Sequence, residues 1–336
     1  MKTLSGKFIT AFLISLLVFV LSASVIGGAL LIGRGEKYTP PSDGGGSKEL
    51  SGSSFNVLLI MTDYAPEKFN DYDPESVKNI FGTDVAPAEA SSGLSPYRKI
   101  YAEDMALLRF DKEREELTYT HIPGNTFVKA KGDVKMRLEE VAAVYGTEYL
   151  VSKVHAIVGV EIDSYILFTP QTAKKALDSV GEITYTVQCD MNYQDPERGL
   201  DINIKAGSQK LDGASAVNML RFENYGQLGV TRSETACGYL KRFVNKLAGD
   251  FTYDEIGDII DTSLSQSNVV SFSSVESRED AIKLLSCGDE LDVKDISLVG
   301  QTQTVDGEKY FRLDEEATLE KFKPYRRINA PENIWD

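Results

Sequence analysis

The sequence predicts an α/β domain in which a mixed central sheet carries helices on both faces, preceded by one transmembrane helix. Residues 8–32 contain no charged side chain, and about 20 apolar residues are enough to span a bilayer as a helix. Residues 36–54 are rich in Gly, Ser and Pro, a composition typical of a flexible tether. Beyond them, strand and helix patterns alternate irregularly, which favours a mixed sheet.

The uncharged stretch sets the expected topology. A cleaved signal peptide would have a shorter apolar core and a small-residue cleavage site. Ala23 and Gly27–Ala29 resemble such a site, but the length of the stretch favours a retained anchor. The basic residues on its two sides nearly balance, so the positive-inside signal is weak. The hydrophilic remainder lies wholly C-terminal, and we expect a single-pass protein of the cell membrane with cytoplasmic residues 1–7, an anchor over 8–33, a linker over 34–54 and an extracytoplasmic domain over 55–336.

Charge and cysteine usage exclude several classes of function. The net charge of −15 argues against nonspecific binding of nucleic acid or of an acidic membrane surface. A phosphate site would have to gather the few arginines locally. Cys189, Cys237 and Cys287 are far apart, odd in number and without a CxxC spacing, so neither a disulfide framework nor a zinc site is indicated. We expect three partly buried thiols.

His121 and His155 are the only histidines. A hydrolase with a Ser–His–Asp or Cys–His arrangement would have to use one of them. His121 alternates with Leu117 and Tyr119, which favours a histidine in the core or at the end of a strand.

The first half of the domain opens with strands. Phe55–Met61 is a continuous apolar run, typical of a strand buried on both faces. Residues 64–98 are polar and contain four prolines, and the length of this segment indicates a surface insertion. Asp104–Phe110 and Glu115–Ile122 are expected to form a hairpin around residues 111–114.

Helical periodicity begins with Lys135–Tyr145, which Gly146 should end. Two more strands are expected at His155–Val160 and Tyr165–Phe168. Thr169 then caps a helix that has Pro170 at its first position and Gly181 just past its end.

Residues 200–223 are expected to form a short strand over Leu200–Ile204, a turn at Gly207 and a helix that begins near Asp212 and delivers Arg221 close to its end. Thr231–Glu234 is a capping box that opens a further helix. Arg232 lies in the first turn of that helix, where free N–H groups and the dipole favour an anion. The tail continues as a helix, followed by strands at Ile296–Val299 and Lys309–Leu313.

Three landmarks in the first half occupy the places of known motifs. Thr62-Asp63 stands where a strand ends in Gly-Thr-Asp, and Ala102–Met105 stands where Arg-Ser-Asp-Thr opens the next strand. Ile122–Thr126 takes the place of an Ile-Pro-Arg-Asp-Thr turn.

Two further landmarks follow in the same order. Arg221-Phe222-Glu223 replaces Arg-Phe-Arg, and Gly229, Arg232 and Ala236 replace the polar positions of Asp-x-x-Arg-x-x-x-Gln; residues 191–195, 200–202 and 207–213 also match closely. Over residues 55–250 the chain therefore resembles the LytR–CpsA–Psr (LCP) family. Those are membrane-anchored enzymes that attach anionic glycopolymers to the Gram-positive wall.

The resemblance implies a substrate and a reaction. The donor would be a polyprenyl-pyrophosphate-linked glycopolymer, and a sugar hydroxyl of peptidoglycan would attack the phosphorus attached to the glycan. Polyprenyl phosphate would leave, and a phosphodiester would remain. Phosphoryl transfer relies mainly on cations that neutralise developing charge and align the attack. The resemblance also implies a long apolar cleft for the polyprenyl tail, for which the apolar stripes within Val141–Tyr145, Ile157–Val160 and Leu240–Leu247 are candidate linings.

Four residues stand at matching positions of the site. Asp63 and Asp104 would hold Mg²⁺ or Mn²⁺, and Arg221 and Arg232 would clamp the pyrophosphate and take part in catalysis, because guanidinium groups are planar and always charged. Each has a structural alternative. Asp63 could be a turn former and Asp104, beside Glu103, a solvated strand end. Arg221 could pair with Glu223 or a neighbouring carboxylate, and Arg232 could pack its stem over the helix start.

Departures from the pattern weaken this site. Gly124 and Asn125 remove a guanidinium and a carboxylate, Ala102 removes an arginine, and Glu223 replaces a cation with an anion; Gly229 and Ala236 lose further polar contacts. Loss of one phosphate-stabilising contact can cost about 3 kcal/mol. Lys129, Lys131 and Lys135 lie just downstream and are candidates for compensation, although a basic run after a turn is usually solvated surface.

The resemblance and the departures from its pattern imply three candidate functions. The first is an LCP-type transferase with altered active-site contacts, and the second is a catalytically impaired relative that binds polyprenyl-linked glycan or another component of wall assembly. The third is an extracytoplasmic regulator of envelope gene expression.

We place Gly124 and Glu223 at the rim of the expected site. The acidic composition and the lack of a basic reading helix argue against direct DNA binding.

Overall fold

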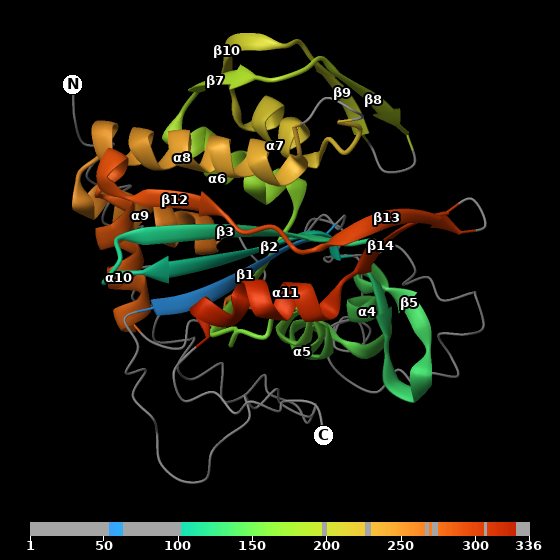
Figure 1. Ribbon diagram of the computed structural model, residues 1–336. Coiled ribbons are helices and arrows are strands. Elements are labelled where there is room, and N and C mark those ends of the chain that lie inside the picture. The colour runs from blue at the N-terminus through green and yellow to red at the C-terminus, as the bar shows by residue number, and fades with distance from the viewer. Residues whose placement is uncertain are drawn as a thin grey trace, which may run out of the picture.

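A six-stranded sheet runs through the centre of the protein, in the order β11-β6-β1-β2-β3-β12 (Figure 1). Strands β1, β2 and β3 are antiparallel neighbours, whereas β6 runs parallel to β1 and β12 runs parallel to β3. The sheet is therefore mixed, as predicted. Its strands are β1 Ser54–Thr62, β2 Ala102–Asp111, β3 Glu116–Pro123, β6 Ser164–Phe168, β11 Val269–Val270 and β12 Asp292–Asp295.

This computed structural model describes residues 54–62, 102–196, 200–225, 230–265, 269–270, 275–305 and 308–326. The expected anchor over 8–33, the linker up to residue 53, Asp63 and the segment 64–98 lie outside the described residues. No helix within the described ranges is long and apolar enough to cross a membrane.

Helices cover both faces of the sheet, which confirms the predicted layers (Figure 1). The face that carries Leu58 and Ile60 packs against α4 Leu138–Tyr145, α5 Thr147–Val158 and α11 Glu315–Phe322. The face that carries Phe55 and Val57 packs against a second set of helices: α6 Pro170–Val180, α8 Arg232–Asp250, α9 Tyr253–Ser265 and α10 Val275–Leu285. Alternate residues of β1 therefore point to opposite faces of the sheet and belong to two separate cores.

A third layer lies beyond α8, on the side away from the sheet (Figure 1). Strand β7 Ile183–Val187 pairs with β10 Gly207–Leu211, and β8 Met191–Asp195 pairs with β9 Leu200–Ile204. These strands share a third core with helix α7 Gly213–Arg221, centred on Met191, Ile202 and Met219. The strand predicted over Leu200–Ile204 and the helix predicted to begin near Asp212 are present, whereas Gly207, predicted as a turn, is the first residue of strand β10.

Two small hairpins flank the end of the sheet at which β2 begins. One joins β4 Phe127–Lys129 to β5 Lys135–Arg137, and the other joins β13 Gly300–Val305 to β14 Glu308–Leu313. A bridge between Thr126 and Phe311 ties the two together. Within the described ranges there are also three short 3-10 turns: η2 Lys131–Asp133, η3 Gly288–Glu290 and η4 Lys323–Tyr325.

The predicted helix caps are confirmed. The Thr231 side chain accepts from the Glu234 N–H, and a Glu234 carboxylate oxygen accepts from the Thr231 N–H at 2.8 Å. Thr169 caps α6 in the same way, with Pro170 at the start of the helix. Such caps satisfy N–H groups that have no partner within the helix.

Three local predictions are wrong. Residues 155–158 are the last turn of α5, because its buried positions keep helical spacing until Gly159 ends the helix in the left-handed region at φ +66°. Lys135–Arg137 pairs with β4 as a strand, so the helix begins only at Leu138. The last strand of the sheet is Asp292–Asp295, and residues 296–299 are not a strand.

The apolar cleft is not lined by the three predicted stripes. Val141 and Ile157 belong to the core on one face of the sheet, while Val244 and Leu247 belong to the core on the other face. Because the sheet separates them, these residues cannot form one cavity.

Candidate functional site

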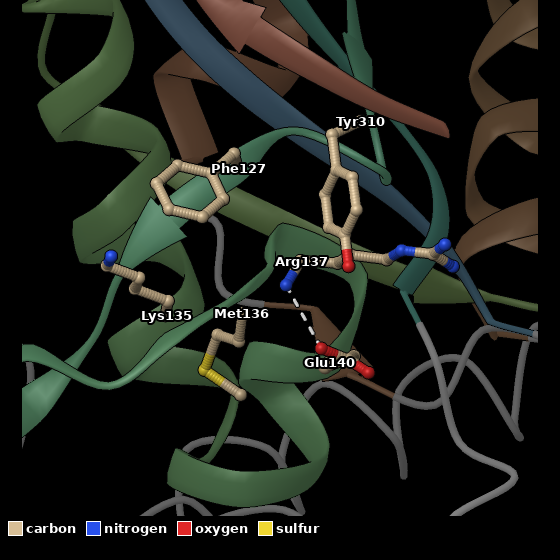
Figure 2. A pocket seen from close by; sticks show the side chains of 6 residues that line it. All are labelled: Phe127, Lys135, Met136, Arg137, Glu140 and Tyr310. Atoms are coloured by element: carbon tan, nitrogen blue, oxygen red, sulfur yellow. Dashed lines mark hydrogen bonds between the residues drawn. The ribbon is translucent and has the colours of Figure 1, made fainter. Parts of the chain in front are cut away.

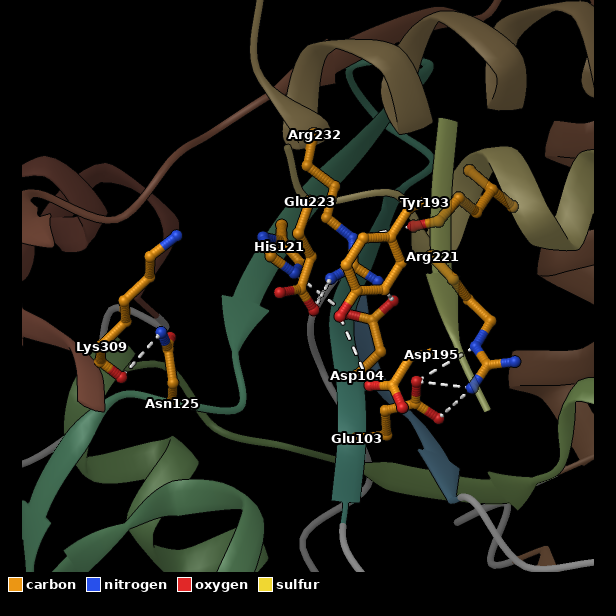
Figure 3. A network of polar contacts seen from close by, with 11 residues as sticks. Glu103, Asp104, His121, Asn125, Tyr193, Asp195, Arg221, Glu223, Arg232 and Lys309 are labelled. Atoms are coloured by element: carbon orange, nitrogen blue, oxygen red, sulfur yellow. Dashed lines mark hydrogen bonds and ion pairs between the residues drawn. The ribbon is translucent and has the colours of Figure 1, made fainter. Parts of the chain in front are cut away.

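Charged side chains gather where β2 begins and β3 ends (Figure 3). Because the two strands are antiparallel, with Asp104 opposite Pro123, the first residues of β2 lie beside the last residues of β3. The C-terminal end of α7 and the N-terminal end of α8 bring Arg221 and Arg232 to the same place. Four elements thus meet in one charged cluster, which consists of Glu103, Asp104, His121, Arg221, Glu223 and Arg232.

Arg221 forms a bidentate ion pair with Glu103. Its Nε lies 3.0 Å from Glu103 Oε1, and its Nη2 lies 2.7 and 2.8 Å from the two carboxylate oxygens. Both side chains are buried, at 6% and 5% exposure. The edge of the planar guanidinium that carries Nε and Nη2 thus faces the carboxylate, and both nitrogens donate to it. Arg221 was expected either to clamp a pyrophosphate or to pair with a carboxylate. The structure shows it paired with a carboxylate, which belongs to β2 and is not that of Glu223.

Arg232 connects three elements. Its Nη2 lies 2.7 Å from Asp104 Oδ2, and its Nη1 lies 3.4 Å from Glu223 Oε1. Its Nε donates to the carbonyl oxygen of Leu220 at 2.7 Å. That carbonyl belongs to the last turn of α7, so Arg232 joins the end of α7, the start of α8 and the first residues of β2.

Asp104 is held between two cationic or donor groups. In addition to the pair with Arg232, its Oδ1 lies 2.9 Å from His121 Nε2. Burial alone would raise the pKa of the Asp104 carboxyl, but Arg232 and His121 outweigh burial and hold this pKa below its ordinary value. Asp104 is therefore an ionised, largely buried carboxylate and not a solvated strand end.

Tyr119 lies near the same carboxylate. Burial, followed by the negative charge of Asp104, raises the pKa of the Tyr119 phenol. This group therefore remains a neutral phenol. Tyr193 and Asp195 of β8 lie beside the charged cluster in Figure 3, with the Tyr193 hydroxyl donating to Asp195 at 3.3 Å.

The balance of charge in the cluster differs from that of a simple anion site. Three carboxylates, those of Glu103, Asp104 and Glu223, face the two guanidinium groups. One negative charge therefore remains when His121 is neutral. An incoming pyrophosphate would have to replace carboxylates as the partner of each guanidinium.

The structure shows where most of the substituted positions lie. Gly124 is buried and not at the rim, because a Cβ there would lie 2.9 Å from both the Glu103 carbonyl oxygen and Glu139 Oε2. Glu223 does lie at the rim, with its side chain 56% exposed. Ala236 is buried in α8, and Gly229 lies outside the described residues.

The lysines downstream do not replace the cation that is missing at Gly124. Lys129 and Lys135 pair across the exposed β4–β5 hairpin. The ammonium of Lys131 lies 5.3 Å from the centre of the Tyr149 ring, in a cation–π contact. They form the solvated surface that a basic run usually forms.

Sequence reasoning missed Glu103 and His121 as members of the cluster. His121 could have been found from the hairpin, because its partner is Ala106 and Asp104 is therefore its diagonal neighbour on the same face. His155, in contrast, is buried in α5, with Nδ1 2.8 Å from the Val160 carbonyl oxygen. All three cysteines are free thiols, two buried and one partly exposed, as predicted.

Asp104 can contribute to a metal site only in part. Among the described residues, no group of three or more His, Cys, Asp or Glu side chains is arranged to hold a metal ion. A carboxylate offers about four lone-pair sites. Arg232, His121 and the Met105 backbone use three of those on Asp104, so capacity for one metal bond remains. The second expected ligand, Asp63, lies outside the described residues.

The fold and the cluster together define an α/β protein with a charged site at one end of a mixed sheet. The sequence pattern of the LytR_cpsA_psr family matches residues 67–325, and the chain belongs to this family. The comparison with curated protein sequences gave no match.

Solved structures show the same fold. TagV of Bacillus subtilis is 16% identical over 81% of this chain and 95% of its own, with a TM-score of 0.59. TagT of the same bacterium, solved bound to LI-WTA, is 16% identical over 81% and 88%, with a TM-score of 0.55. TagT with bound octaprenyl pyrophosphate lipid is 15% identical over 81% and 88%, with a TM-score of 0.52.

The buried ion pair generates a stability prediction. Glu103→Ala should lower the free energy of unfolding by about 3–5 kcal/mol, because it leaves the Arg221 guanidinium buried without a counter-charge. The double substitution Glu103→Leu with Arg221→Met should recover most of this loss, since it removes both charges and keeps apolar volume. Denaturant unfolding of the full-length protein measures both. Equal stability of the Glu103→Ala variant and the unsubstituted protein would show that the pair is not buried in solution.

The second prediction concerns Asp104. Arg232→Ala should raise the pKa of this carboxyl, because burial persists while its strongest counter-charge is lost. A folded-state pKa below the unfolded value of about 3.9 stabilises the fold above that pH, and this contribution is lost as the pH falls through the folded value. Titration of ¹³C-labelled aspartate carboxyls measures the shift. Arg242→Ala, on an exposed part of the same helix, is the matched control, and an identical Asp104 titration in both variants would contradict the contact.

Proposed function

We propose that this protein transfers a glycopolymer from a polyprenyl-pyrophosphate carrier to peptidoglycan and forms a phosphodiester link. The observation that carries the proposal is the meeting of Asp104, Arg221 and Arg232 in one cluster, each at a position that matches a family motif. Membership in the family supports it, as does the relative TagT, which was solved with bound octaprenyl pyrophosphate lipid.

The reaction would exchange one phosphorus–oxygen bond for another. A peptidoglycan hydroxyl oxygen forms a bond to the phosphorus attached to the glycan, and the bond from that phosphorus to the bridging oxygen breaks. Polyprenyl phosphate leaves with the electron pair, and the hydroxyl proton passes to solvent. Mg²⁺ or Mn²⁺, when bound by Asp63 and Asp104, would neutralise charge on the phosphate oxygens.

The protein's own contribution is electrostatic. Arg232 stands at the N-terminus of α8, where backbone N–H groups add to its positive charge. It would turn from Glu223, its exposed and longer contact, toward the donor phosphate while keeping Asp104 in place. His121 holds the second oxygen of Asp104 and so fixes the orientation of the carboxylate.

The location follows from the same proposal. A donor carried on a polyprenyl chain stays in the membrane, and the anchor over residues 8–33 would hold the domain beside it. We therefore place residues 55–336 outside the cell membrane of a Gram-positive type of envelope, with peptidoglycan as the acceptor.

A second function is favoured by one observation. Arg221 is engaged by both oxygens of Glu103 in a buried pair, and breaking such a pair costs several kcal/mol. This argues for a relative that binds polyprenyl-linked glycan, or regulates envelope assembly, without turnover.

One assay separates the two functions. The full-length protein in detergent is incubated with Mg²⁺, a polyprenyl-pyrophosphate-linked glycopolymer and peptidoglycan, and phosphodiester-linked product is measured by mass spectrometry after muramidase digestion. We expect product that is lost when EDTA removes the metal. Donor binding without product would instead support the binding relative, and the absence of both would contradict both functions.

The exposed rim carboxylate generates a gain-of-function prediction. Glu223→Arg should strengthen donor binding several-fold, because it removes the anion beside Arg232 and adds a phosphate contact. Arg232→Ala should weaken donor binding. Isothermal titration with the donor measures both.

Glu182→Arg is the control for the change in net charge, since its side chain is 58% exposed, close to the 56% of Glu223, and is paired with Lys210 elsewhere on the surface. If Glu223→Arg and Arg232→Ala both left donor affinity unchanged, the charged cluster would not be the donor site.

A further inference from the structure

A separate pocket of about 370 Å³ opens beside the two small hairpins (Figure 2). Its volume falls within the roughly 300–1,000 Å³ of small-molecule sites. None of its lining residues belongs to the charged cluster or to the family motifs described above. They come from β4, β5, the first turn of α4 and β14, and are Phe127, Lys135, Met136, Arg137, Glu140 and Tyr310.

Two aromatic rings form one wall of this pocket. Phe127 and Tyr310 meet edge to face, with ring centres 6.3 Å apart and an interplanar angle of 77°. Phe127 is 37% exposed, which is unusual for so large an apolar side chain. The guanidinium carbon of Arg137 lies 5.1 Å from the Tyr310 ring centre, and this cation–π contact holds the tyrosine in place.

Polar groups in the pocket remain available for a ligand. Within the described residues, the Lys135 ammonium has no ion-pair partner and the Tyr310 hydroxyl makes no hydrogen bond. Arg137 and Glu140 are already engaged, with Arg137 Nη1 3.1 Å from Glu139 and the Arg137 backbone N–H donating to Glu140 at 3.0 Å. The pocket thus combines fixed aromatic rings with one free cation and one free hydroxyl.

A single turn connects the pocket to the charged cluster. Pro123 pairs with Asp104 across the sheet. Phe127 follows four residues after Pro123, so the Cα atoms of Pro123 and Phe127 are at most about 14 Å apart. The turn is fixed to β14, because the Phe311 N–H donates to the Asn125 carbonyl oxygen at 3.0 Å and the Asn125 amide donates to the Lys309 carbonyl oxygen at 3.3 Å. One extended ligand can therefore reach both places.

We propose that this pocket binds a pyranose ring of a glycan chain, as a subsite of the function proposed above. The C–H groups on the face of a sugar ring match the electron-rich face of an aromatic ring. The Tyr310 hydroxyl and Lys135 would contact sugar oxygens or an acidic substituent. The charged residues around the pocket exclude the polyprenyl tail, because desolvating Lys135 and Glu140 against hydrocarbon is costly.

The test uses the full-length protein in detergent and saturation-transfer NMR with two sugar probes. One probe is peptidoglycan glycan strands freed of peptides, and the other is glycopolymer released from its lipid carrier. We expect saturation of ring protons in at least one probe, and a loss of affinity of about tenfold in Phe127→Ala and in Tyr310→Ala. The probe that binds identifies the source as acceptor or donor.

Two controls keep the outcomes separate. Tyr253→Ala removes another exposed aromatic ring, 43% accessible and on α9, and should leave sugar binding unchanged. Farnesyl pyrophosphate, which carries no sugar, should bind all three variants and the unsubstituted protein equally. Sugar binding by neither probe, or unchanged binding in both pocket variants, would overturn the subsite even if farnesyl pyrophosphate bound. Failure of farnesyl pyrophosphate alone would count against the proposed function and leave the sugar subsite standing.

Discussion

The buried ion pair between Glu103 and Arg221 fixes the relation between the third layer and the central sheet. Neither charge can be left alone in the interior without a cost of several kcal/mol, so the end of α7 must stay over the start of β2. The bond from Arg232 to the Leu220 carbonyl oxygen extends this constraint to α8. The contacts of Arg232 then orient the side chains of Asp104 and Glu223. The geometry of the whole charged cluster therefore depends on one pair whose members are 118 positions apart in sequence.

The same pair determines what the cluster can bind. A diphosphate is attracted by guanidinium groups whose donors are free, whereas both guanidinium groups here already contact carboxylates. Under the proposed function, a divalent cation beside Asp104 would reverse this balance, because it adds two positive charges. The cost of separating Arg232 from Glu223 is small, since Glu223 is exposed and exposed pairs contribute at most about 1 kcal/mol. The cost of separating Arg221 from Glu103 is much larger, which makes Arg232 the adaptable cation and Arg221 the fixed one.

The sequence predicts the features that depend on neighbouring residues. The capping box at Thr231 and the buried strand β1 depend on patterns of a few residues, and both are present. The apolar run at residues 155–160 is too short to distinguish the two periodicities, and the preceding turns of α5 decide it as helix. The Glu103–Arg221 pair could not be predicted, because an acidic residue before Asp104 looks like a solvated strand end until the sheet and α7 are placed together. The sequence shows where residues of the family motifs are replaced. It does not show which side chains occupy the space that those residues would take.

Gly124 illustrates this last point and links the charged cluster to the aromatic pocket. A side chain at Gly124 would collide with Glu139, whose N–H donates to the Gly124 carbonyl oxygen at 2.8 Å. Glu139 in turn binds Arg137, and Arg137 stacks on Tyr310. Gly124 thus leaves room for Glu139, which holds the Arg137 guanidinium beside Tyr310. The Arg137 guanidinium lies beside the two aromatic rings of the pocket. Under the proposed function, the departures at this turn would weaken the contact with pyrophosphate, whereas the aromatic rings beside it would suit a sugar.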